Sequence, residues 1–149
     1  MNTLCKYRTV FVKEDVINGA INEVSVTSAE DVVEMLNSAV QLNNRPQEEV
    51  WVVHLNTKMQ VIGIEMISMG SISSSLAAPA DIFRGAIMQG AYAIVMAHNH
   101  PSGDPTPSKA DIDTAKQLAK CGELLCIQLV DSIVIGGDEH VSLKTAGLM

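Results

Sequence analysis

The chain has 149 residues, of which 47% are hydrophobic and 3% aromatic, and its formal charge is −7. This length suits a single domain with an aliphatic core, and the acidic charge disfavours nucleic acid as a partner. Three cysteines without a CxxC pair exclude a disulfide framework, and the absence of a long apolar run or signal-peptide core predicts a cytoplasmic protein with no membrane span.

The first half of the chain predicts strands, a helix and a hairpin. Residues 7–12 and 22–26 have strand character, and Ser28 can cap a helix that begins near Ala29. The β-branched run over 49–56 and the run over 59–68 are typical of a hairpin. Small and serine-rich residues over 70–78 predict a loop with a short strand. Pro79 then suits the first turn of a helix over 80–90.

The second half predicts the strand and helix that carry the chemistry. The continuous apolar run over 92–97 is typical of a strand buried on both faces. A helix is expected from Ser108 to about Gly122, followed by strands over 124–130, 132–135 and 139–142. Because helices and strands alternate, we expect an α/β (α+β) fold with a single mixed β-sheet flanked by helices.

Two histidines follow the buried strand directly. His98 and His100 are two residues apart, so in extended backbone their side chains point to the same side. Asp111 adds a carboxylate at the start of the next helix. Two imidazoles and one carboxylate form a ligand set that zinc takes in catalytic sites, although some iron enzymes use the same set. The residues alone therefore indicate a metal site without fixing the metal.

Two features of this motif have alternative interpretations. Ser108 and Asp111 have the spacing of a helix capping box, in which each side chain bonds the other's backbone N–H. Asp104, in the intervening loop, is a weaker substitute ligand. A hydrolase also needs a base, and Glu48 and Glu49 stand at the head of a strand, where at most one of them can face a given site.

These residues resemble a known family. The pattern Glu…His-x-His-x7-Ser-x-x-Asp is similar to that of the JAMM (MPN+, JAB-domain) metalloproteases, and residues 49–137 resemble their RadC-like branch. The resemblance rests on the strings EVWVVHLNTKMQVIG, AHNHPSGDPTPSKADI and LVDSIVIGG. It implies a JAB/MPN-like, cytidine-deaminase-like architecture for one domain over 1–149. The motif-bearing part is expected over about 46–140, with 1–45 as its N-terminal part.

The resemblance also implies roles for the site residues. One Zn²⁺ per chain would be held by His98, His100 and Asp111, with water in the fourth position. Glu49 is expected to be the general base, with Glu48 as the alternative, and Ser108 to help stabilise the oxyanion. Asn99 should face away from the imidazoles and have a structural role.

The functional prediction is a zinc-dependent metallopeptidase or isopeptidase that acts on a peptide or protein, including a ubiquitin-like conjugate. Two alternatives come from other classes of protein. One is a DNA-repair-associated RadC-like role, against which the acidic charge argues. The other is a non-catalytic binding module of the JAB fold. Neither the substrate nor the oligomeric state follows from the sequence.

Overall fold

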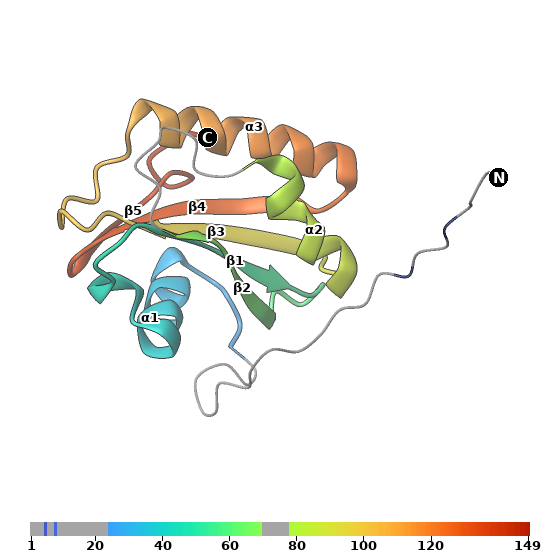
Figure 1. The fold of residues 1–149 in the computed structure, drawn as a ribbon, viewed down its shortest axis with the longest axis horizontal. Helices are drawn as coiled ribbons and strands as arrows, with labels where there is room; N and C mark the ends of the chain where they lie inside the picture. Colours follow the sequence, from blue (N-terminus) through green and yellow to red (C-terminus); the bar gives the residue numbers. More distant parts are fainter. Residues whose placement is uncertain (1–4, 6–7, 9–23, 70–77) are drawn as a thin grey trace.

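The computed structural model describes Cys5, Arg8, residues 24–69 and residues 78–149. Its centre is one mixed sheet with the strand order β2-β1-β3-β4-β5, seen nearly edge-on in Figure 1. Only β3 and β4 are parallel, and the other neighbours are antiparallel. The strands are β1 (Glu49–Leu55), β2 (Val61–Met69), β3 (Ala93–Asn99), β4 (Gln128–Gly136) and β5 (Glu139–Ser142).

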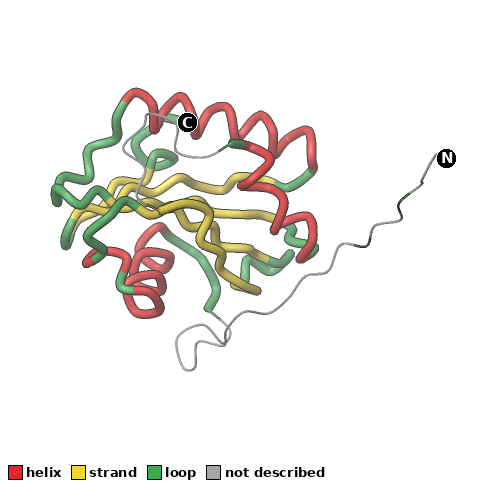
Figure 2. The backbone as a smooth tube through the Cα atoms, viewed as in Figure 1, coloured by secondary structure: helices red, strands yellow, loops and turns green. Residues whose placement is uncertain are grey.

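Helices cover both faces of the sheet (Figures 1 and 2). Helix α1 (Ala29–Val40) packs on one face, and α2 (Pro79–Gln89) and α3 (Lys109–Leu125) pack on the other. Side chains of β3 alternate between the two cores: Val95 and Ala97 join the α1 side, whereas Ile94 and Met96 join the α2 and α3 side. The strand is buried along its whole length, which confirms the expectation for the apolar run over 92–97.

Local sequence signals explain most of the element boundaries. Ser28 caps α1 in a capping box with Asp31, and Pro79 occupies the first turn of α2. Gly90 ends α2 in the left-handed conformation, with φ of 69°. The predicted hairpin and the short strand at 139–142 are confirmed as β1–β2 and β5.

Two predictions about the elements were wrong. Helix α3 continues through Leu125 rather than ending near Gly122, and the two strands predicted over 124–130 and 132–135 are the single strand β4. Gly122 is not the helix end but a point of close packing, where a Cβ would lie 2.4 Å from the Ile127 oxygen, and the helix is instead capped by Cys126 in the left-handed conformation. Of residues 22–26, Ser25 forms an isolated bridge with Gln60. The strand expected over 7–12 and the segment 70–77 lie outside the described residues, apart from Arg8.

The sheet buries one histidine far from the motif. His54, which is 1% exposed, contacts the Gln89 side chain through Nδ1, and its Nε2 lies 3.6 Å from Glu65 Oε2. Burial lowers its pKa below the usual 6.5, although contacts with Gln89 and Glu65 oppose the shift. Burial therefore favours the neutral form of His54, whose Nε2 has no hydrogen-bond partner.

This burial predicts a pH dependence of stability. Below about pH 6.5 the unfolded chain protonates His54 more readily than the folded chain does, so the free energy of unfolding should fall as the pH drops. Urea unfolding at about pH 7.5 and 5.5 should show a smaller pH effect in His54→Gln than in the wild type. Equal pH effects in the two proteins would contradict the assignment.

Among the described residues, no helix is both long and apolar enough to span a membrane.

Candidate metal centre

The candidate site forms where β3 ends. His98 pairs with Val50 of β1 and Val134 of β4, and it is fully buried. The chain then leaves the sheet, and the His100 backbone N–H donates to the Ile135 carbonyl at 2.7 Å. This last bond holds the loop entrance against β4. As a result, both imidazoles meet at one edge of the sheet, with their Nε2 atoms 3.2 Å apart.

Asp111 brings its carboxylate against both imidazoles, with one oxygen facing each ring. Its Oδ1 lies 3.4 Å from His98 Nε2, and its Oδ2 lies 3.3 Å from His100 Nε2. Zinc holds nitrogen and oxygen ligands at about 2.0–2.1 Å, so neighbouring ligands of a tetrahedral ion are about 3.3 Å apart. The separation of the two Nε2 atoms is close to that edge length, and each imidazole has one Asp111 oxygen at a similar distance, although the two oxygens differ. The site residues thus fit a zinc ion in ligand chemistry, with the two imidazoles at ligand spacing.

Asp111 also caps its own helix. Ser108 is the N-cap of α3, its Oγ accepts the Asp111 backbone N–H at 3.1 Å, and Asp111 Oδ2 accepts the Ser108 backbone N–H at 2.8 Å. Burial would raise the pKa of Asp111, but hydrogen bonds from His98 and Ser108 outweigh it and lower the pKa to about 2. The carboxylate is therefore charged at neutral pH, as a metal ligand must be. The two interpretations of Asp111 are compatible rather than exclusive.

The loop between β3 and α3 orients the second imidazole. His100 Nδ1 is 2.9 Å from the backbone carbonyl of Asp104. A carbonyl can only accept, so Nδ1 carries the proton and Nε2 keeps the lone pair that a metal needs. The Asp104 carboxylate instead accepts from the backbone N–H and the hydroxyl of Thr106. Asp104 therefore contributes its backbone, and the structure does not support it as a substitute ligand.

Gly136 allows this loop to lie against β4. A Cβ at position 136 would lie 2.5 Å from Pro105 N and 2.7 Å from Gly103 O, both of them backbone atoms. No L-side chain fits there without displacing the loop that holds the Asp104 carbonyl. Sequence reasoning missed both Gly136 and this carbonyl, because neither carries a recognisable motif.

Gly136→Ala should therefore displace the loop and destabilise the protein by about 1–3 kcal/mol, the usual cost of overpacking. Urea unfolding would measure the loss. Gly63→Ala is a matched control, because its Cβ would meet only the flexible end of the Gln89 side chain. A Gly136→Ala protein as stable as the wild type would show that the loop yields freely.

The structure separates the two candidate bases. Glu48 Oε1 lies 4.0 Å from His98 Nε2, and ligand atoms of Glu48, His98 and His100 lie within 4.8 Å of one another. Glu49 is on the opposite face of β1, where its carboxylate accepts from Trp51 Nε1 at 2.8 Å and pairs with Arg45 Nε at 3.7 Å. The expectation that Glu49 faces the histidines is thus not met, because alternation along the strand directs its neighbour there.

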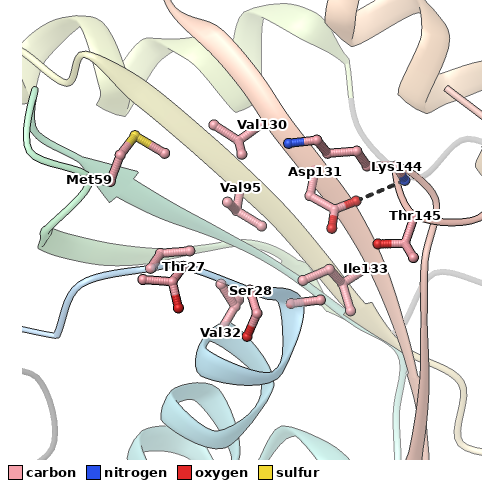
Figure 3. Close-up of a pocket in the computed structure, with 12 residues that line it drawn as sticks. Thr27, Ser28, Val32, Met59, Val95, Val130, Asp131, Ile133, Lys144 and Thr145 are labelled. Atoms are coloured by element: carbon pink, nitrogen blue, oxygen red, sulfur yellow. Dashed lines mark hydrogen bonds between the residues drawn. The ribbon is translucent and has the colours of Figure 1, made fainter.

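A separate pocket of about 230 Å³ lies on the α1 face (Figure 3). The start of α1 forms one wall, with Thr27, Ser28 and Val32, and β4 forms another with Asp131 and Ile133. The Asp131 carboxylate accepts from the backbone N–H of Ser132, that of Lys144 and the hydroxyl of Ser142. With its acid so engaged, and without either motif histidine in its lining, this pocket is not the candidate site.

Comparison with known proteins gives a consistent match. Residues 9–148 match the family described as RadC-like JAB domain. The chain is 43% identical over 128 residues to a UPF0758 protein of Clostridium beijerinckii, covering 86% of this chain and 55% of that protein. A UPF0758 protein of Carboxydothermus hydrogenoformans is 41% identical over 85% of this chain and 55% of its own length. The chain thus spans about half the length of these curated relatives.

Proposed function

The chain belongs to the family of RadC-like JAB domains, and we propose that it is a zinc-dependent metallopeptidase or isopeptidase, which hydrolyses an amide bond with water. One observation carries this proposal. The Nε2 atoms of His98 and His100 are 3.2 Å apart, and each lies 3.3–3.4 Å from one oxygen of the Asp111 carboxylate, so two imidazoles and a carboxylate converge at about the 3.3 Å spacing of zinc ligands. These three side chains would hold the ion, and a further ligand position would remain for water or substrate.

Two residues near the histidines and Asp111 are proposed for the other parts of such a reaction. When bound, zinc supplies a Lewis acid that polarises the scissile carbonyl and lowers the pKa of water. Glu48 is the general base in this proposal, because its carboxylate stands near His98 but beyond ligand spacing. It removes a proton from the attacking water and returns one to the leaving amine.

Ser108 is the proposed donor to the oxyanion. Its Oγ accepts the Asp111 backbone N–H, which leaves its own O–H able to donate toward a substrate. Its side chain is exposed at the start of α3, so a substrate carbonyl can reach it. A hydroxyl held in this way stabilises the negative charge of a tetrahedral intermediate by about 3 kcal/mol.

The substrate proposed is a peptide or a protein conjugate, including one with a ubiquitin-like modifier. The proposed reaction class is supported by the residues of the site, where a zinc ion would lie beside a carboxylate that can act as a base and a hydroxyl that can donate to an oxyanion. Nucleic acid is disfavoured by the formal charge of −7.

Metal analysis of the purified protein tests the proposal. We expect about one zinc ion per chain, and His98→Ala should lose it because two ligands rarely retain zinc. His140→Ala is the control, since His140 pairs with Glu30 of α1, on the face of the sheet opposite the motif histidines. Zinc retained at the same stoichiometry in His98→Ala would contradict the metal site. A zinc-loaded chain that cleaves no peptide or isopeptide would contradict the hydrolase while sparing the metal site.

A further inference from the structure

Asn99 lies between the two motif histidines but faces away from them. It is 2% exposed, and its side chain reaches the segment that leads into β1. Its Oδ1 accepts the Glu49 backbone N–H at 2.7 Å, and its Nδ2 donates to the carbonyls of Gln47 at 3.0 Å and Arg45 at 3.3 Å. All three hydrogen bonds of one buried carboxamide therefore go to the backbone of a single five-residue segment.

These bonds lie on both sides of Glu48. The pairing of β1 with β3 ends at Val50 and His98, so Glu48 lies beyond the last residue pair of these two strands. The Gln47 carbonyl before Glu48 and the Glu49 amide after it are both fixed by Asn99. With the backbone held at these two points, the Glu48 side chain is directed to the opposite face, toward His98.

We propose that Asn99 is the positioning residue for Glu48: its carboxamide extends the β1–β3 pairing by one residue and thereby aims the Glu48 carboxylate at the metal centre. The inference rests on the proposed function where it gives Glu48 a catalytic role. The bonding pattern demands this residue type, because a carboxamide offers one acceptor and two donors on a short side chain. An aspartate would turn oxygen toward two carbonyls, and a leucine would leave three backbone groups without partners.

The chain offers a matched control at the other end of β1. Asn56 is also an asparagine whose side chain holds backbone, since its Oδ1 accepts the N–H groups of Lys58 and Gln60. It lies in the β1–β2 turn, remote from both histidines. Asn56→Leu thus removes comparable hydrogen bonds without touching the segment that carries Glu48.

The test compares Asn99→Leu and Asn99→Asp with Glu48→Gln and Asn56→Leu, each loaded with Co²⁺ or Zn²⁺. Both Asn99 variants should take up metal at the wild-type stoichiometry, yet their Co²⁺ absorption spectra should change as that of Glu48→Gln does. Hydrogen exchange of the Glu49 amide should accelerate. On a peptide or isopeptide substrate, kcat should fall about 100-fold with little change in KM, as expected for a misplaced catalytic group. Asn56→Leu should change none of these quantities.

Unchanged kcat, Co²⁺ spectrum and Glu49 exchange in a folded Asn99 variant would overturn the inference. If Asn99→Leu fails to fold, Asn99→Asp, which has the same shape, decides the question. Failure of the proposed function can be distinguished from failure of the inference about Asn99. A wild-type chain that takes up no metal and cleaves no substrate overturns that function, while the Glu49 exchange still shows whether Asn99 holds the segment.

Discussion

Glu48→Gln is expected to lower kcat for amide hydrolysis by a factor of about 10²–10⁴, the usual contribution of a general base. The substitution preserves the shape of the side chain but removes its ability to accept a proton at neutral pH. Zinc content should remain at the wild-type level, because Glu48 Oε1 lies 4.0 Å from His98 Nε2, farther than the edge of about 3.3 Å in a zinc tetrahedron. Steady-state kinetics and metal analysis of the same preparation would measure both quantities.

Glu49→Gln is the matched control, because it makes the same chemical change one residue away on the opposite face. It should retain near wild-type kcat and lose about 1 kcal/mol of stability, because its carboxylate accepts the Trp51 indole N–H. The reverse outcome, with kcat lost in Glu49→Gln and kept in Glu48→Gln, would reinstate Glu49 as the base. Zinc loss in Glu48→Gln would instead make Glu48 a ligand, as the close grouping of Glu48, His98 and His100 allows.

The sequence predicted the fold class because its patterns are local. The apolar run at 92–97, the capping box at Ser28 and the glycine at position 90 each act through neighbouring residues, and each appears where expected. The error in β4 has a tertiary cause. Gly122 suggested a helix end, but this glycine instead admits the backbone of the following strand at close range, which no local pattern reveals.

The sequence indicated which side chains of the candidate site come together, but not the contacts that support them. Alternation in an extended strand puts His98 and His100 on one side, and the family resemblance, rather than spacing alone, brought Asp111 to them. The choice between Glu48 and Glu49 depends on which of the two side chains points to the sheet face that carries the histidines. Strand register decides this, and composition does not reveal it. His100 contacts the backbone carbonyl of Asp104, and the Asn99 side chain hydrogen-bonds to the backbone before β1. The side-chain pattern of a sequence does not encode such contacts with backbone.

Asp111→Asn should lower zinc affinity more than 100-fold, beyond the 10–100-fold cost of losing an outer partner of a ligand. The carboxylate contacts both imidazoles, at 3.4 and 3.3 Å, and a neutral amide binds zinc poorly. The same change weakens the cap of α3, since Asp111 Oδ2 accepts the Ser108 backbone N–H. Competition with a chelator would measure the affinity, and urea unfolding of the metal-free protein would measure the cap.

Asp31→Asn separates these two effects. Asp31 forms the same capping box with Ser28 at the start of α1, where its carboxylate accepts from Thr27 and Ser28 and does not lie against histidines. This variant should lose about 1 kcal/mol of stability, typical of a weakened cap, and keep its zinc affinity. If Asp111→Asn instead matched Asp31→Asn in both measurements, Asp111 would be a cap alone. The metal would then depend on Glu48 as its carboxylate, and the assignment of base and ligand would have to be exchanged.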